Sequence, residues 1–307
     1  MRIVISGITS FIGSAIARLA LSKNIEVLGI ARNPLHPSIS GIHMGDRLKI
    51  ICADLSEYKN IGEFKCDYDV FFHLAWTGTD VIERDNINMQ LNNINTTLSA
   101  VDLAERLGCK SFIFAGSQAE YGVVASNIKL SPSTPVNPHN AYAMSKFAAG
   151  RLAYLCCKKK EIRHCHIRIL STYGEFNSEN TFIMYLIKSF LAGDSPQVTE
   201  CKQIWDYCYV DDVAQAMLAI GIKGQDGAIY PLGSGVALPM RYYVEIIHKI
   251  INPEVPIGYG KIDYYPNQPM YLCADIAKLT EDTGFKPLYS FEEGITRTIN
   301  WYRSQLS

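Results

Sequence analysis

The first half of the chain alternates short aliphatic and β-branched runs with stretches in which apolar residues recur at helical spacing. The runs predict strands over residues 2–6, 25–30, 48–52, 70–74, 111–115 and 164–169. The helical spacing predicts helices over residues 12–22, 92–107 and 142–159. Strands that alternate with helices are typical of βαβ units. The pattern therefore predicts an α/β fold with a doubly wound parallel sheet.

The pattern changes after residue 173, where proline and aromatic residues are more frequent and the elements are shorter. We expect this part to form a smaller C-terminal α/β lobe. Residues 205–220 read as a strand followed by a helix and are expected to return to the first lobe. The predicted division is therefore discontinuous, with residues 1–172 plus 204–232 in one domain and residues 173–203 plus 233–307 in the other.

The amino-acid composition argues against two classes of function, nucleic-acid binding and membrane insertion. The chain has 307 residues, of which 48% are hydrophobic, so it can bury a large core. Its 29 basic and 30 acidic residues nearly cancel, and no basic stripe interleaves with aromatics, which argues against a nucleic-acid partner. No stretch approaches the roughly 20 apolar residues of a membrane span. A cytoplasmic protein without a membrane partner is the expectation.

Cysteine and histidine spacing gives no sign of a metal site. The nine cysteines lack CxxC spacing and are expected to be reduced thiols. His164 and His166 alternate with Cys165 in a predicted strand, which sends the histidines to one face and the thiol to the other. Packing is the favoured reading of these residues, because a zinc site needs three or four converging ligands.

A glycine loop follows the first predicted strand and opens the first helix. Gly7 stands at the start of this loop, Gly13 at its end and Ser10 midway between them. In this context backbone N–H groups can approach a pyrophosphate at a helix N-terminus. A glycine loop in isolation could also be a plain tight turn. The strand and helix around it favour a dinucleotide-binding loop of Rossmann type.

A tyrosine and a lysine lie four residues apart, Tyr142 and Lys146. On a helix these positions share a face, so the ammonium of Lys146 can lie beneath the phenol of Tyr142 and stabilise its phenolate. Such a tyrosine can act as an acid or a base near neutral pH. The alternative is a pair of side chains on a solvated helix face.

Six segments carry recognisable motifs in order along the chain. They are residues 6–13, similar to TGxxGxxG with Ser10 for the middle glycine, 73–76 (HLAA), 93–98 (NVxGTxxL), 114–122 (SSSxxVYG), 167–174 (LRxxNVYG) and 205–212 (RDYxxVxD). Together they resemble the extended short-chain dehydrogenase/reductase family of nucleotide-sugar epimerases, dehydratases and 4-ketoreductases, over essentially the whole length. The resemblance implies a Rossmann domain with a smaller substrate-binding lobe, and a homodimer formed through residues 92–107 and 142–159.

The resemblance also implies roles by position. Tyr142 would exchange a proton with the sugar oxygen, Lys146 would lower its pKa and hold the nicotinamide ribose, and Ser117 would orient the substrate oxygen. Besides Tyr142 and Lys146, the residues expected at the cofactor are Gly7, Thr9, Ser10, Phe11, Ile12, Gly13, Arg32, Asp54, Leu55, Leu74, Ala75, Trp76 and Asn93. Those expected at the substrate are Ser117, Gln118, Ser171, Trp205, Arg168 and Arg241. Asp54 could equally cap the segment that follows it.

The end of the second predicted strand indicates the cofactor. An acidic residue there accepts hydrogen bonds from the ribose of NAD, whereas an arginine accommodates the extra phosphate of NADP. This chain has Ala31 followed by Arg32. We therefore expect NADP(H), with NAD(H) as the second choice.

The residues after Ser117 indicate the reaction. Dehydratases of the family have acids where this chain has Gln118 and Ala119, and neither can transfer a proton. Glu120 comes one place too late and is expected to face away. Because an NADP preference favours net reduction, we expect a 4-ketoreductase acting on a 4-keto-6-deoxy nucleotide sugar. The alternatives are a 4-epimerase with tightly bound NAD and a non-catalytic NADP sensor on the same fold.

Three departures from the family pattern concern the substrate diphosphate. Trp205 stands where an arginine is usual, a second usual arginine is missing from residues 264–269, and Ser171 replaces an asparagine. Either other cations take over or the substrate is not an ordinary nucleoside diphosphate sugar. The candidate cations are Arg168, Lys188, Lys202 and Arg241. Trp205 could stack on a base or sugar, or pack between the lobes.

Overall fold

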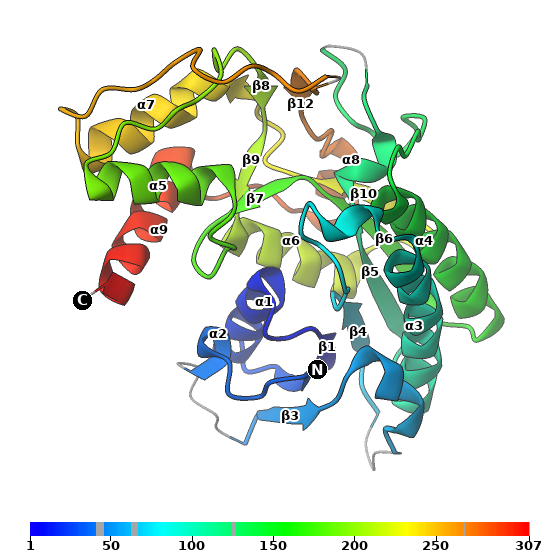
Figure 1. Cartoon of the computed structure of the whole chain (residues 1–307). Helices are drawn as coiled ribbons and strands as arrows, with labels where there is room; N and C mark the ends of the chain where they lie inside the picture. The colour runs from blue at the N-terminus through cyan, green and yellow to red at the C-terminus, as the bar shows by residue number, and fades with distance from the viewer. Residues whose placement is uncertain (41–45, 63–66, 125–126, 267, 307) are drawn as a thin grey trace.

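A computed structural model describes residues 1–40, 46–62, 67–124, 127–266 and 268–306 (Figure 1). Its centre is a seven-stranded parallel sheet in the order β10-β6-β5-β4-β1-β2-β3. The strands are β1 (Arg2–Ser6), β2 (Glu26–Ala31), β3 (Leu48–Cys52), β4 (Val70–His73), β5 (Ser111–Ser117), β6 (Arg163–Ile169) and β10 (Ile229–Leu232). The predicted α/β fold of Rossmann type is confirmed.

Helices cover both faces of the sheet (Figure 1). The pair α1 (Phe11–Ser22) and α6 (Val210–Lys223) packs on one face, and the pair α3 (Ile87–Arg106) and α4 (Ala141–Lys159) packs on the other. Ile3 and Ile5 belong to the core on the α1 and α6 side, whereas Val4 belongs to the core on the α3 and α4 side. The strands read as continuous apolar runs because both faces are buried.

The predicted elements agree with the observed ones to within a residue or two, except at the start of α3. This helix begins at Ile87, five residues before the predicted start. Its first five residues, 87–91, alternate apolar and polar side chains, a period of two rather than the period of a helix, so helical periodicity missed them. The start is fixed by Asn86, whose side chain accepts a hydrogen bond from the Met89 N–H at 3.1 Å.

The side chains of His164, Cys165 and His166 alternate between the two faces of the sheet, as expected. His164 stacks on Phe112 and His166 packs edge-on against Phe114, whereas Cys165 lies in the opposite core. Burial lowers the pKa of His164 to about 3, so this imidazole is neutral. The cysteines that the structure describes are free thiols. Among the described residues, no helix combines the length and the apolar character that crossing a bilayer requires.

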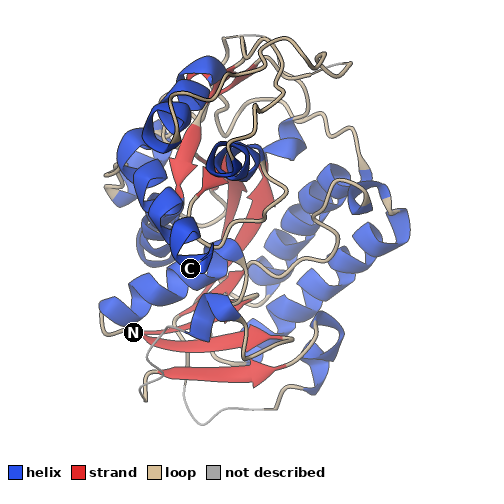
Figure 2. Cartoon of the chain, turned by 60° about the vertical axis from the view of Figure 1, so that its left-hand side comes forward, coloured by secondary structure: helices blue, strands red, loops and turns tan. Residues whose placement is uncertain are grey.

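A second lobe lies beyond the carboxyl ends of the strands (Figure 2). It contains α5 (Phe182–Ala192), α7 (Met240–Ile251), α9 (Phe291–Leu306) and a small sheet of β11 (Leu238–Pro239), β8 (Ile204–Trp205) and β12 (Tyr271–Leu272). α8 (Ala277–Thr283) packs instead against α6 and β10 of the large sheet. A parallel pair, β7 (Ser171–Tyr173) and β9 (Tyr207–Tyr209), leads into it. The remaining short elements are α2 (Pro37–Ser40), η1 (Leu55–Asn60), η2 (Glu83–Asp85) and η3 (Gln118–Tyr121).

The chain returns to the large sheet with α6, a few residues after residue 204, where the sequence predicted the return. α6 packs against α1, and β10 extends the sheet beside β6. By contrast, β8 pairs with β11 and β12 of the second lobe, although residues 204–205 were expected in the first. A two-residue strand carries too little pattern to show which sheet it will join.

Candidate active site

The glycine loop between β1 and α1 is shaped by close backbone approach. Gly7 has a φ of +73°, and a Cβ at this position would lie 2.9 Å from the Ala75 nitrogen. A Cβ on Gly13 would collide with the Gly7 carbonyl oxygen. Ser10 caps α1, since its Oγ accepts a hydrogen bond from the Gly13 N–H at 3.1 Å. The first turn of α1 carries no acidic residue, so its N-terminus suits an anion such as a pyrophosphate.

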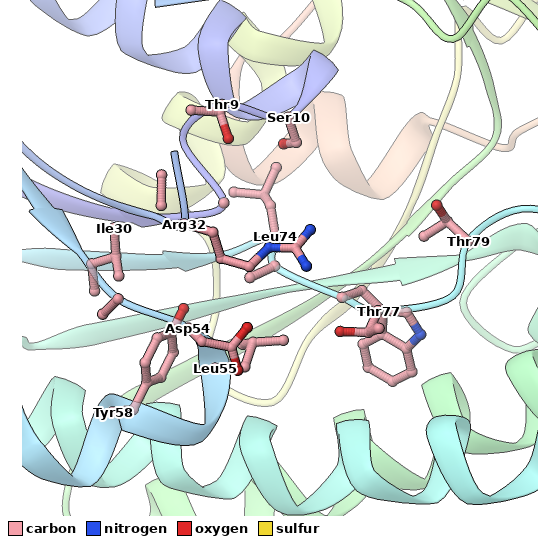
Figure 3. A pocket seen from close by; sticks show the side chains of 15 residues that line it. Thr9, Ser10, Ile30, Arg32, Asp54, Leu55, Tyr58, Leu74, Thr77 and Thr79 are labelled. Atoms are coloured by element: carbon pink, nitrogen blue, oxygen red, sulfur yellow. The ribbon is translucent and has the colours of Figure 1, made fainter. Parts of the chain in front are cut away.

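A pocket of about 260 Å³ opens beside this loop (Figure 3). Its lining includes the predicted cofactor residues Gly7, Thr9, Ser10, Arg32, Asp54, Leu55, Leu74, Ala75 and Trp76. Figure 3 shows Arg32 reaching across the pocket, with Asp54 and Tyr58 on the side of η1. The loop and the pocket therefore fit a dinucleotide, although its lining also contains residues that the sequence did not single out.

Asp54 lines the pocket and also caps η1. Its Oδ1 accepts hydrogen bonds from the Ser56 N–H at 3.0 Å and the Ser56 hydroxyl at 2.9 Å. These bonds, with a contribution from Arg32, hold the pKa of the Asp54 carboxyl below its usual range. The side chain of Glu57 in turn accepts a hydrogen bond from the Asp54 N–H at 2.6 Å. The capping alternative left open by the sequence is therefore present in the structure.

Two of the residues expected at the cofactor support the site from outside its pockets. Gly13 makes room for the loop as described above. Asn93 lies on α3, where its Oδ1 accepts from the Thr77 N–H at 2.9 Å and its Nδ2 donates to the Thr77 carbonyl at 2.8 Å. Asn93 thus fixes the segment after β4, which carries Ala75 and Trp76 into the pocket.

A second pocket, of about 290 Å³, continues from the first and holds the candidate catalytic residues. Tyr142 and Lys146 reach it from α4, and Ser117 reaches it from the end of β5. Phe11 and Ile12, which were expected at the cofactor, also line it. The two pockets share Ser10, Leu74, Trp76 and Thr79, so together they form one crevice along the strand ends.

Lys146 lies close to Tyr142 without being centred under its ring. Its Nζ is 5.9 Å from the centre of the Tyr142 ring and 3.9 Å from that of Trp76. The ammonium donates a hydrogen bond to the Ala115 carbonyl at 2.7 Å, which draws it toward the end of β5. Burial lowers the pKa of Lys146 to about 7. The i, i+4 spacing predicted the shared helix face but not this partner.

Tyr142 is itself buried, which raises the pKa of its phenol. A hydrogen bond with Ser117 and the charge of Arg84 act in the opposite direction. The Arg84 guanidinium lies 5.1 Å from the centre of the Tyr142 ring. The phenol of Tyr142 therefore has both a hydroxyl neighbour, Ser117, and a cationic neighbour, Arg84.

Ser117 is held by a buried network behind it. Its Oγ accepts a hydrogen bond from the Ala119 N–H at 3.2 Å, and its own N–H donates to Glu120 at 2.9 Å. Glu120 points into the interior, where it accepts from His166 Nε2 and Arg168 Nε, each at 2.9 Å. Burial opposes ionisation of Glu120, but His166 and Arg168 outweigh it, so the pKa of this carboxyl is lowered.

A larger cavity of about 840 Å³ extends from Ser117 into the second lobe. Of the residues expected at the substrate, it is lined by Ser117, Gln118, Ser171 and Trp205. Trp205 Nε1 donates a hydrogen bond to Ser171 Oγ at 2.8 Å, which joins the two replacements seen in the sequence. Trp205 also packs against two of the hydrophobic cores.

The structure does not bring Arg168 or Arg241 to this cavity. Arg168 is only 2% exposed and forms an ion pair with Glu120. The Arg241 guanidinium stacks 4.1 Å from the centre of the Tyr259 ring. Arg84, from η2, lines the cavity instead. Sequence reasoning missed Arg84 because it lies between motifs, in a segment without a family pattern.

The fold and site define a dinucleotide-binding α/β protein with a tyrosine, a lysine and a serine in one crevice. A family model for the NAD dependent epimerase/dehydratase family matches residues 3–233. The chain belongs to this family, which is a family of enzymes. The resemblance inferred from the motifs is thereby confirmed.

Individual relatives are distant. A dTDP-glucose 4,6-dehydratase from Xanthomonas campestris pv. campestris is 27% identical over 206 residues, which cover 62% of this chain and 57% of the relative, less than two thirds of its length. Among solved structures, a UDP-N-acetylglucosamine 4-epimerase from Methanobrevibacter ruminantium has a TM-score of 0.87 at 24% identity, covering 99% of this chain and 98% of that one. A Bacillus cereus UDP-glucuronic acid 4-epimerase, solved with NAD, has a TM-score of 0.86 at 20% identity and covers 100% of both chains. These structures support the fold.

Proposed function

We propose that this protein is an NAD(P)-dependent oxidoreductase acting at C4 of a nucleotide sugar, with Tyr142, Lys146 and Ser117 as its catalytic residues. One observation carries this proposal. The three side chains line a single pocket that joins the glycine-loop pocket at one side and shares Ser117 with the 840 Å³ cavity at the other. A cofactor and a sugar entering from the two sides would meet at these residues.

The chemistry of these residues supports the proposal. The nicotinamide cofactor, when bound, supplies or accepts the hydride. The Tyr142 hydroxyl exchanges the proton of the sugar oxygen, and the Ser117 hydroxyl orients that oxygen by a hydrogen bond. Lys146 carries a positive charge below pH 7, at 3.9 Å from the centre of the Trp76 ring and 5.9 Å from that of the Tyr142 ring, and this charge favours the ionised phenol.

We propose NADP(H) as the preferred cofactor, with NAD(H) as the second candidate. Arg32 lines the pocket directly after β2, at the position where a 2′-phosphate would lie. β2 itself ends in Ala31, which offers no carboxylate to a free ribose hydroxyl. Asp54 lies across the pocket from Arg32 and is available to the adenosine.

For the reaction, we propose reduction of the 4-keto group of a 4-keto-6-deoxy nucleotide sugar. A dehydratase needs a proton-transferring acid beside Ser117, but the side chains that follow it into the cavity are Gln118 and Ala119. The next residue, Glu120, is committed to His166 and Arg168 in the interior. An epimerase with tightly bound NAD is the second candidate, favoured by the shared fold of solved 4-epimerases.

The test is a comparison of reactions with purified protein. Absorbance and chromatography of the released nucleotide identify any cofactor that remains bound. Oxidation of NADPH, and more slowly of NADH, with dTDP- or UDP-linked 4-keto-6-deoxyglucose supports the reductase. Interconversion of UDP-glucose and UDP-galactose without added cofactor supports the epimerase. Binding of NADPH with no turnover in either assay supports the non-catalytic sensor.

We further propose a homodimer formed through α3 and α4. These helices pack side by side and expose apolar side chains, including Leu91 at 51%, Met144 at 51% and Leu155 at 53%. Such residues favour a second copy as the partner. Leu155→Glu should convert the dimer to a monomer in light scattering; a wild-type monomer at micromolar concentration contradicts this proposal.

A further inference from the structure

The 840 Å³ cavity has an unusual charge distribution. Among the described residues that line it, Arg84 is the one that carries a formal charge; the others are apolar, hydroxyl-bearing, amide or aromatic. A nucleotide sugar carries a diphosphate, and in some cases a carboxylate as well. Any anionic group that enters this cavity therefore finds a single full positive charge in the described lining.

Arg84 is positioned by its surroundings and keeps donors free. Its Nε donates a hydrogen bond to the Thr79 carbonyl at 2.9 Å, and its guanidinium lies 5.1 Å from the centre of the Tyr142 ring. The next residue, Asp85, accepts from the Ala141 N–H at 3.4 Å, which ties η2 to the start of α4. Within the described residues, Nη1 and Nη2 of Arg84 have no hydrogen-bond or ion-pair partner.

The cations that the sequence offered as replacements are occupied elsewhere. Arg168 is paired with Glu120 in the interior, and Lys188 forms an ion pair with Glu179 at 3.0 Å on the surface. Arg241 stacks on Tyr259. None of these residues lines the cavity, and neither does Lys202. The missing arginines of the family pattern are therefore not replaced from these positions.

We infer that Arg84 binds the anionic group of the substrate, next to the carbon on which Tyr142 acts. Two free N–H donors of a guanidinium match two oxygens of a phosphate or a carboxylate. Because the guanidinium lies against the Tyr142 ring, the anion it holds is within about one sugar ring of the reacting oxygen. That distance fits either the diphosphate on C1 or a carboxylate carried by the sugar, and both present the same chemistry. This inference rests on the proposed function.

The experiment measures binding rather than turnover. Calorimetry with the full-length protein compares UDP with uridine, dTDP with thymidine, and UDP-glucuronic acid with UDP-glucose. The variants are Arg84→Gln, which removes the charge, and Arg84→Lys, which keeps the charge but loses the paired donors. Arg297→Gln is the matched control, because Arg297 also stacks on a tyrosine, 4.7 Å from the centre of Tyr289, but lies on α9 outside the cavity.

Wild type should bind the anionic probe of at least one pair more tightly than its neutral or less charged counterpart. In Arg84→Gln that preference should fall by about tenfold or more, while uridine and thymidine bind as before. Arg84→Lys should lose less, and Arg297→Gln should change nothing. Equal losses for UDP-glucose and UDP-glucuronic acid identify the diphosphate as the bound anion, whereas a larger loss for the latter identifies a sugar carboxylate.

Two results overturn the inference. One is a wild type that prefers none of the anionic probes, and the other is an Arg84→Gln variant that binds all of them as wild type does. Thermal melting of each variant shows whether a loss of binding reflects unfolding. Failure of the proposed function has a different signature, because it abolishes turnover with every sugar and leaves the effect of Arg84 on binding intact.

Discussion

The glycine-loop pocket and the 840 Å³ cavity draw their linings from different kinds of segment. The pocket is lined by residues that follow β1, β2, β3 and β4, which are all parallel strands of one sheet. The cavity is lined by η2, the end of β5, β7, α5 and β8, and by the side chains of Ile262, Tyr265 and Gln268. In a parallel sheet the carboxyl ends of the strands meet at one edge, so the pocket follows from topology. The cavity depends on how distant segments pack.

The two regions also differ in charge. The pocket brings Arg32 and Asp54 together, and α1 presents its N-terminus to it. The cavity is mostly neutral and has Arg84 at the end nearest Tyr142. Tyr142, Lys146 and Ser117 lie where the two regions meet. The predictions below act first on this junction and then on each side of it.

The largest effect is expected for Tyr142→Phe. Loss of the phenolic hydroxyl removes the proton-exchanging group, so kcat should fall by about 1,000-fold. Cofactor affinity, measured by fluorescence titration, should remain within about twofold, because the ring is retained. Tyr154→Phe on the same helix is the control and should keep full activity, since Tyr154 lies outside both pockets and the cavity. A Tyr142→Phe enzyme with more than a tenth of wild-type turnover contradicts the assigned role.

Sequence reasoning succeeded where the topology of the parallel sheet fixes the position of a segment. The glycine loop, the end of β5 and the first turns of α4 are separated in sequence, but each follows or packs on a strand whose place in the sheet is set by βαβ topology. The motifs alone therefore sufficed to place Gly7, Ser117 and Tyr142 at one edge of the sheet.

The same reasoning could not place the arginines. Arg168 lies on β6, and its ion pair with Glu120 in the interior becomes visible only in the packed structure. Glu120 occupies the position of an apolar residue in the SSSxxVYG pattern, so no motif predicts a buried carboxylate. Arg84 lies on a three-residue turn without periodicity, where local sequence carries no information about the cavity it lines.

The buried network behind Ser117 gives the second prediction. In Glu120→Gln the amide retains the shape of the side chain but leaves Arg168 as an uncompensated buried charge. The free energy of unfolding should fall by about 3 kcal/mol, as measured by urea denaturation. Glu179→Gln, which breaks the exposed pair with Lys188, should leave stability nearly unchanged. Equal stability changes in the two variants contradict the assignment of Glu120 as an ionised carboxylate.

Lys146 gives a prediction about pH. Burial lowers its pKa to about 7 in the folded protein, whereas in the unfolded chain the pKa is near its ordinary value of 10.5. Between these values the unfolded chain binds a proton that the folded protein does not, so unfolding takes up a proton. This residue therefore makes the free energy of unfolding rise with pH, by at most about 1.4 kcal/mol per pH unit.

Lys146→Met removes this contribution. Urea denaturation of the apoprotein at pH 7, 8 and 9 should show a slope against pH that is lower in the variant than in wild type. The difference between the two slopes is the measured quantity, because the cysteine thiols that ionise in the unfolded chain contribute equally in both proteins. Parallel slopes contradict a neutral Lys146 at pH 9.

The smallest effect is expected on the outer side of the pocket, at Arg32. This side chain is exposed, so water screens its charge, and Arg32→Ser should weaken NADPH binding by about tenfold while NADH binding stays the same. Lys49→Ser removes the same charge from an exposed position of β3 outside the pocket and should alter neither affinity. The effect at Arg32 should shrink as salt concentration rises, whereas a loss of van der Waals packing would not depend on salt. If both cofactors weaken equally, Arg32 contacts a part of the dinucleotide that NAD and NADP share, and the proposed preference for NADP(H) loses its structural basis.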